Sequence, residues 1–257
     1  GTYTGGITAV AKTTVTSGKV YGVAVTTGAA GDLTVAKATL DVRPDDATRV
    51  YHSANPTFTA TYSGFVAGDD VSVIDALMSL TSTATLTSNV GNYAITASGG
   101  SDNNYQFHVT GTGLLKITPY QLALSGLSGV SRIYDGTTAA HFSGTAAISP
   151  FGGDDVRITG TLTATASFAD KNVGTNKAIT LAGFGLTGAA AGNYSLVLPT
   201  NLVASITPAS LTLSGLIAQN RTYDATTAAT LTGTAAVTPF GSDVVTLAGT
   251  AAATFAN

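Results

Sequence analysis

The amino-acid sequence repeats itself, and this internal repeat limits the chain to folds that can be built from tandem copies of one unit. A series of short markers recurs in the same order. In the first copy the series is Val50-Tyr51, Gly68-Asp69-Asp70-Val71, Asn89-Val90-Gly91, Asn104-Tyr105 and Ile117-Thr118-Pro119. A second series runs from Ile133-Tyr134 to Ile206-Thr207-Pro208, and a third runs from Thr222-Tyr223 through Gly241-Ser242-Asp243-Val244. Tyr51 precedes Tyr134 by 83 residues, and Tyr134 precedes Tyr223 by 89.

The marker spacing divides the chain into four segments. Residues 38–119 form module one, residues 120–208 form module two, and residues 209–257 form a truncated module three. Residues 1–37 are expected to be the tail of a preceding repeat. An alternative for 1–37 is the end of a parallel β-helix, because that stretch alternates small and β-branched residues with glycine turns. Both ends of the sequence are expected to be cut within a repeat of a longer protein.

Alternation of apolar and polar residues with a period of two predicts an all-β chain. Phe58, Ala60 and Tyr62 alternate with threonines, for example. Six or seven short strands in 83–89 residues is the size of an immunoglobulin-like β-sandwich, so we expect tandem modules of this kind in a linear array. The alternative is a β-grasp-like module with one short helix. Residues 69–77 are the best helix candidate, with an aspartate at the start.

Composition excludes several classes of protein. The net charge is −3, only 10% of residues are charged and no basic cluster exists, so no nucleic-acid partner is expected. No apolar stretch is long enough to span a membrane, and cysteine is absent. His52, His108 and His141 lack metal-ligand spacing. No catalytic residue and no cofactor is therefore predicted, and the protein is not expected to be an enzyme.

Acidic loops and sequons provide weak candidate sites. Asp70, Asp155 and Asp243 each stand before a valine and are weak calcium candidates, but Ca²⁺ needs six to eight oxygen ligands and one such loop supplies one or two. An Asx-type turn is the favoured interpretation. Asn193 and Asn220 begin glycosylation sequons, which occur by chance in threonine-rich chains.

The tyrosine of the first marker recurs at Tyr51, Tyr134 and Tyr223. We expect these side chains to be half-buried aromatics that anchor a corner, with sugar-stacking platforms as the alternative. Asp135 and Asp224, which follow two of them, are expected to fix the next turn through hydrogen bonds to the backbone.

The ordered markers resemble those of known repeats. Module one resembles the MBG repeat of bacterial adhesins, through Val50-Tyr51, Gly68-Asp69, Val90-Gly91-Asn92-Tyr93 and Asn104-Tyr105. Modules two and three resemble the sister YDG repeat, named for the tripeptide that stands here as Tyr134-Asp135-Gly136. Two positions depart from the pattern. Ala225 follows Asp224 in module three, and His52 stands where the family often has glycine.

The resemblance implies a large secreted adhesin of the filamentous-haemagglutinin or biofilm-matrix kind, located outside the cell at the bacterial surface. In such a protein the repeats would form a structural stalk that extends a binding region for adhesion or biofilm formation. Neighbouring repeats of the same chain would be their main partners. The alternative is that the modules themselves grip polysaccharide or host and matrix glycans.

Overall fold

The computed structural model describes residues 2–3, 33–34, 36–66, 68–161 and 163–256. The chain divides into two compact units, Gly1–Pro119 and Tyr120–Asn257, and each is described by itself. In the first unit, β1 (Thr2–Tyr3) pairs antiparallel with β2 (Leu33–Thr34). The two interpretations of residues 1–37, as a repeat tail or as the end of a β-helix, fall mostly on residues 4–32, which lie outside the described residues.

Module one consists of two sheets. The three-stranded sheet has the order β5-β3-β8, and the four-stranded sheet has the order β4-β9-β7-β6. The bounds of these strands are β3 Ala38–Pro44, β4 Ala47–Val50, β5 Ala60–Ser63, β6 Ser79–Ser82, β7 Gly91–Ser98, β8 Tyr105–Val109 and β9 Gly113–Thr118.

The core of module one lies between these two sheets. Leu40 and Val42 on β3 are fully buried, and so is Ile95 on β7. Leu115 and Ile117 on β9 are at most 1% exposed. Buried and exposed residues alternate along β3 and β9, as expected for strands with one face on the core. The alternation of apolar and polar residues in the sequence therefore determines which side chains of β3 and β9 face the core.

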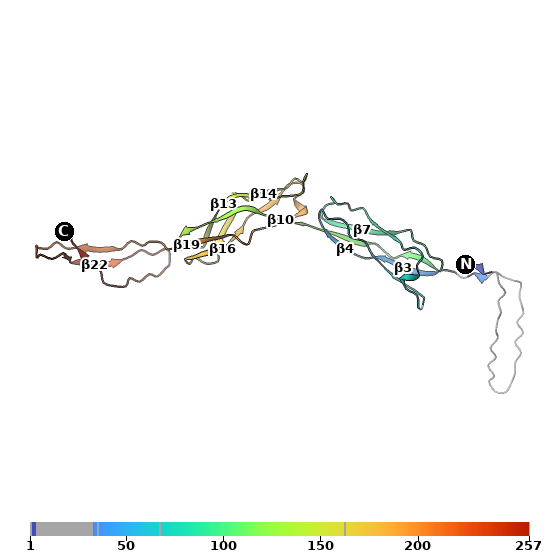
Figure 1. Cartoon of the computed structure of the whole chain (residues 1–257), viewed down its shortest axis with the longest axis horizontal. Coiled ribbons are helices and arrows are strands. Elements are labelled where there is room, and N and C mark those ends of the chain that lie inside the picture. The colour runs from blue at the N-terminus through green and yellow to red at the C-terminus, as the bar shows by residue number, and fades with distance from the viewer. Residues whose placement is uncertain (1, 4–32, 35, 67, 162, 257) are drawn as a thin grey trace, which may run out of the picture. The chain divides into compact units, whose positions relative to one another are not determined.

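The chain enters and leaves module one along parallel strands. β3 is parallel to β8, with Ala38 opposite Tyr105, and β4 is parallel to β9, with Val50 opposite Thr118. The first two strands therefore run in the same direction as the last two (Figure 1). The chain enters the module at Ala38 and leaves it beyond Thr118 at the opposite end.

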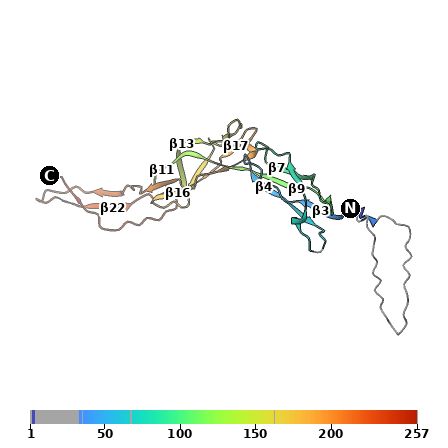
Figure 2. The same cartoon turned by 45° about the vertical axis from the view of Figure 1, so that its right-hand side comes forward.

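Module two contains one large sheet and two small ones (Figure 2). The six-stranded sheet has the order β11-β13-β15-β16-β19-β12, while β10 pairs with β18 and β14 pairs with β17. The bounds are β10 Tyr120–Ala123, β11 Ser125–Val130, β12 Arg132–Ile133, β13 Ala139–Ala147, β14 Arg157–Thr159, β15 Thr165–Phe168, β16 Gly174–Ala182, β17 Gly185–Thr187, β18 Tyr194–Val197 and β19 Val203–Thr207. As in module one, the entering strands β10 and β12 are parallel to the leaving strands β18 and β19.

The core of module two is enclosed because β11 lies against β19. Phe168, Ile179, Leu181 and Ile206 are at most 5% exposed and form the centre of this core. A Cβ atom on Gly129 of β11 would lie 2.3 Å from the carbonyl oxygen of Val203. Only glycine allows the two backbones to come this close, so Gly129 permits the sheet to close around the core.

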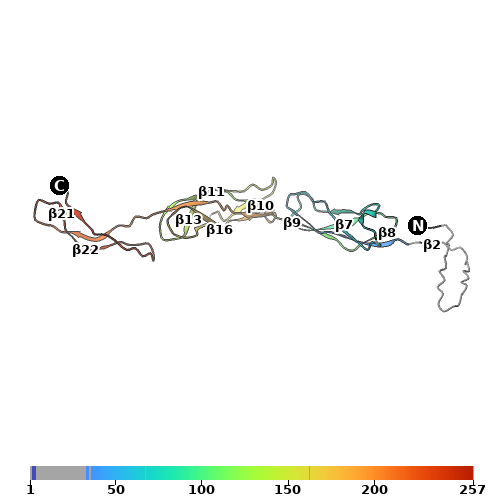
Figure 3. The same cartoon turned by 60° about the horizontal axis from the view of Figure 1, so that its bottom comes forward.

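Module three reproduces the first pairings of module two (Figure 3). β20 (Ser214–Ala218) pairs with β22 (Leu231–Ala236), as β11 does with β13, and β21 (Ala228–Ala229) pairs with β23 (Ala253–Thr254). Leu211 and Leu213, which alternate with polar residues, lie outside any strand. Their counterparts Leu122 and Leu124 in module two are buried beside β18, and the 257-residue sequence does not reach a counterpart of β18.

The predicted all-β class is confirmed: modules one and two are built of several sheets, in which the entering strands pair in parallel with the leaving strands. Helical structure in the described ranges is limited to two 3-10 turns, η1 (Val71–Val73) and η2 (Ala191–Asn193). The helix predicted as a candidate over 69–77 is therefore reduced to the single turn η1. It does not continue because the backbone N–H of Asp75 donates to the Asp102 carboxylate at 3.2 Å and not to a carbonyl of the preceding turn. No helix among the described residues has the length and apolar character to cross a membrane.

Candidate functional site

The tyrosine of the first marker lies beside the strand that closes its module. The backbone N–H of Tyr51 donates to the carbonyl oxygen of Thr118 at 2.8 Å, and that of Tyr134 donates to Thr207 at 2.8 Å. The first marker and the Ile-Thr-Pro marker therefore share one end of the module, although nearly the whole repeat separates them in sequence. We call this end of each module the tyrosine end.

The aspartate after the tyrosine shapes the next turn. The Asp135 carboxylate accepts hydrogen bonds from the backbone N–H and the hydroxyl of Thr137, at 2.9 and 2.8 Å. These bonds and the nearby Arg132 guanidinium hold the pKa of Asp135 below its ordinary value. Asp224 bonds to Thr226 in the same way, at 3.0 and 2.9 Å. The turn survives in module three although alanine replaces the glycine of the tripeptide.

An arginine two residues before the tyrosine supports this turn, and the sequence reasoning missed it. The Arg132 side chain is 8% exposed. Its guanidinium donates to the carbonyl oxygens of Ala139, Thr137 and Ile133, at 2.8, 2.6 and 3.1 Å. It also lies 5.7 Å from the ring centroid of Phe168. Arg132 therefore joins the turn to the core below it.

The same arginine recurs in the other modules. Arg49 is 6% exposed and donates to the Asn55 side chain at 2.7 Å and to the Thr85 carbonyl at 2.5 Å. Arg221 lies 5.3 Å from the ring centroid of Phe255. An available signal was its recurrence at a fixed distance from the tyrosine, in a chain with only 11 lysines and arginines.

The turn needs a residue with positive φ. Gly136 has φ 80°, and at the matching position Ala225 has φ 59°. In module one the positive φ is at His52, with 63°, which explains why glycine is favoured at that site.

We expect opposite effects from two substitutions at this position. Gly136→Ala should lower the free energy of unfolding of module two by about 1–2 kcal/mol, because an L-residue is strained at this φ. Ala225→Gly should raise the stability of module three by roughly 0.5 kcal/mol, because relief of strain exceeds the added freedom of the unfolded chain. Hydrogen exchange of the strand amides measures both. Gly152→Ala is the control, since its φ is not strained and a Cβ there meets no atom within 4 Å.

An aspartate loop occupies the other end of each module. In every copy the backbone N–H of the aspartate donates to the carbonyl oxygen three residues earlier: from Asp69 to Val66 at 3.0 Å, from Asp154 to Phe151 at 3.2 Å and from Asp243 to Phe240 at 3.0 Å. Asp243 thus corresponds to Asp69 and Asp154, and the register that grouped it with Asp70 and Asp155 was wrong. The sequence alignment had matched the three aspartates that stand directly before a valine. The turn hydrogen bond shows that the loop of module three is shifted by one residue relative to that alignment.

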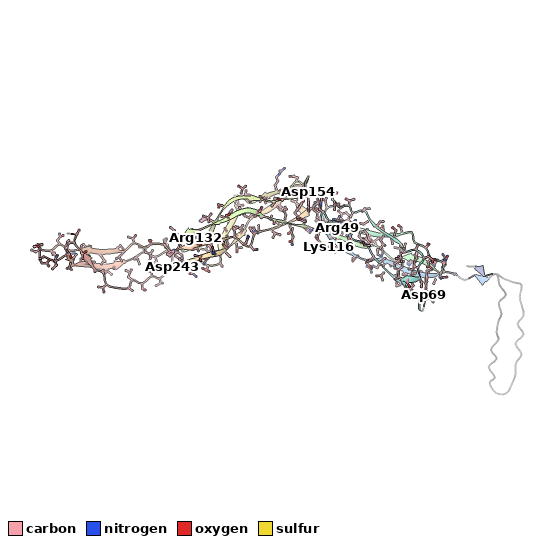
Figure 4. All side chains as sticks on the ribbon, viewed as in Figure 1. Arg49, Asp69, Lys116, Arg132, Asp154 and Asp243 are labelled. Atoms are coloured by element: carbon pink, nitrogen blue, oxygen red, sulfur yellow. The ribbon has the colours of Figure 1, made fainter. Side chains whose placement is uncertain are left out.

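The tyrosine of the Asn-Tyr marker fastens this loop. The Tyr105 hydroxyl donates to Asp69 at 2.7 Å and accepts the backbone N–H of Val66 at 3.0 Å. Tyr194 binds Asp154 and the backbone N–H of Phe151 in the same way, at 2.5 and 3.0 Å. Figure 4 places Arg49 and Asp69 toward opposite ends of module one, and Arg132 and Asp154 toward opposite ends of module two. We call the end with this loop the aspartate end.

The three calcium candidates do not converge on a metal site. Asp70 accepts the backbone N–H of Ser72 at 2.8 Å and caps η1, and Asp155 lies 3.0 Å from Arg157. Asp243 bonds to a lysine and a tyrosine, as described below. No group of three or more histidine or acidic side chains that could hold a metal ion is found within the described ranges.

The two sequons differ in access. Asn193 ends η2 and is 6% exposed, so the folded module buries the side chain that a glycan would need. Asn220 is exposed. Glycosylation of the folded protein is therefore limited to Asn220 as a candidate.

These features define a class of protein: a tandem array of β modules, each with a tyrosine end and an aspartate end. Comparison with family models then identifies the modules. An MBG domain of the YGX type matches residues 40–115, and the YDG domain matches residues 118–202 and 207–257. Because the YDG matches cover more than half of the chain, the chain belongs to the YDG domain family, with an MBG domain ahead of them. The predicted MBG and YDG modules are thus confirmed. No curated protein and no solved structure shows significant similarity to the chain.

Proposed function

We propose that this chain is a stalk segment of a secreted bacterial adhesin, in which the modules hold a binding region away from the cell surface. The proposal places the chain outside the cell and assigns it no catalysis. Its main partners would be other repeats of the same protein.

One observation carries the proposal: the chain enters each complete module at one end and leaves it at the opposite end. Residues 38–50 run beside 105–118 in the same direction, and residues 120–133 run beside 194–207 in the same way. A strand residue adds about 3.3 Å, so each repeat should add roughly 30–40 Å of length. A domain with adjacent termini would add no such length.

Small-angle X-ray scattering of the full chain tests the stalk. A compact protein of this length has a radius of gyration of roughly 18 Å. We expect a clearly larger value, with the pair-distance distribution of an elongated particle. A value near that of a compact protein would contradict the proposal.

The rival function is direct binding of glycans through exposed tyrosines. Tyr51 is 3% exposed, and Tyr134 is half-buried with its ring in contact with Phe240, so neither ring is the open platform that sugar stacking needs. Tyr223 is 90% exposed. We expect no binding on a glycan array, and binding that disappears in Tyr223→Ala would favour the rival function.

A further inference from the structure

The tyrosine end of module two contacts the aspartate end of module three, within the second unit. The Asp243 carboxylate accepts hydrogen bonds from the Tyr134 hydroxyl and from the Lys171 ammonium. The side chain of Asp243 is only 19% exposed and that of Lys171 is 37% exposed, so both are partly removed from water. Lys171 and Tyr134 hold the pKa of Asp243 below its ordinary value, so the carboxylate stays charged to a lower pH than a free aspartate does.

An aromatic contact adjoins this polar one. The ring of Phe240 lies edge-on to the ring of Tyr134, with 6.0 Å between the centroids. Phe240 also rests on the backbone of Gly136, where an added Cβ would lie 3.1 Å from the Cβ of Phe240. The absence of a side chain at Gly136 therefore leaves room for the phenylalanine of the next module.

Each residue of the tripeptide thus has a part in the joint. Tyr134 donates to the next module, Asp135 holds the turn with Arg132, and Gly136 supplies both the positive φ and the space for Phe240. Tyr223 stands at the matching position of module three, where no loop of the described residues covers it, and it is 90% exposed.

We propose that the Tyr-Asp-Gly turn is a docking site for the following repeat, and that its ligand is the Pro-Phe-Gly-x-Asp loop of another module of this kind. The loop here is Pro239 to Asp243. Docking is head to tail, because the two halves lie at opposite ends of a module, so the contact can recur without closing on itself. The joint is then held in one orientation by side chains and not only by the peptide linkage. This inference describes how the proposed stalk keeps its direction, and so rests on the proposed function.

Distance measurement between two spin labels tests the docking in the full chain. The chain has no cysteine, so Thr180→Cys on β16 and Ala236→Cys on β22 give two unique labels at exposed positions. Double electron–electron resonance should give one narrow distance distribution. We expect that narrow peak to be lost in Asp243→Asn and in Tyr134→Phe, since each removes one partner of the polar contact. Circular dichroism confirms that the variants remain folded, and Tyr134→Phe keeps the aromatic ring.

Tyr223→Phe is the matched control, because it removes the same hydroxyl from a 90% exposed tyrosine that no loop of the described residues contacts. The narrow peak should persist in it. A broad distribution in the unsubstituted chain would overturn the docking, as would a narrow peak retained in both joint variants or lost equally in the control. The proposed stalk is tested separately by small-angle scattering. Scattering of an elongated particle together with a broad distribution of label distances would indicate a flexible stalk and would reject only the docked joint.

Discussion

Replacing Ile117 by alanine should lower the free energy of unfolding of module one by about 2–5 kcal/mol. Ile117 is 1% exposed and lies on β9, the strand that pairs with both β4 and β7. Removal of its outer carbon atoms leaves a cavity in the core, under the four-stranded sheet in which β9 joins β4 to β7. Because small domains are stable by only 5–15 kcal/mol, this loss is a large share of the total.

Urea denaturation of the full chain, with hydrogen exchange to assign the loss to module one, measures the effect. Leu114→Ala is the control, since Leu114 lies on the same strand and is 41% exposed. We expect the control to lose much less stability. Equal losses would mean that the alternation along β9 does not set the core.

Replacing Arg132 by methionine should destabilise module two by about 2–4 kcal/mol, because three carbonyl oxygens lose a charged donor in a partly buried place. Methionine keeps an unbranched chain of similar length, so the change isolates the guanidinium. The strand amides of β12 and β19 should exchange faster with solvent, since Arg132 begins β12.

Arg157→Met is the matched control for this change. The Arg157 side chain is 76% exposed and pairs with Asp155 on the surface, and exposed pairs of this kind contribute about 0–1 kcal/mol. If Arg132→Met had no more effect than Arg157→Met, the arginine would not be the support of the turn that its hydrogen bonds indicate.

The all-β class was predictable because it depends on local alternation. β9 shows this alternation, because Leu115 and Ile117 face the core and Lys116 between them faces outward. The parallel pairs were not predictable, because Ala38 meets Tyr105 across a sequence separation that no local pattern encodes.

The site was predicted in part. Sequence reasoning singled out Tyr134, Asp135 and Gly136 but treated them as features of one corner. It could not show that Asp243 would meet Tyr134, because that contact joins two repeats, and it gave Arg132 no role. A repeated residue shows that a position matters in each copy. Its contacts with a neighbouring repeat depend on how the two modules pack, which the sequence of one repeat does not encode.

The parallel pairing of entering and leaving strands has a mechanical consequence. Tension applied to the chain would pull β4 and β9 of module one in opposite directions along their own axes, since the chain enters before β4 and leaves after β9. The hydrogen bonds between them, which are evenly spaced in a parallel pair, would then bear the load together in shear. An antiparallel hairpin pulled open from its free end would instead lose its bonds one after another. The topology of module one therefore suits a segment that carries tension.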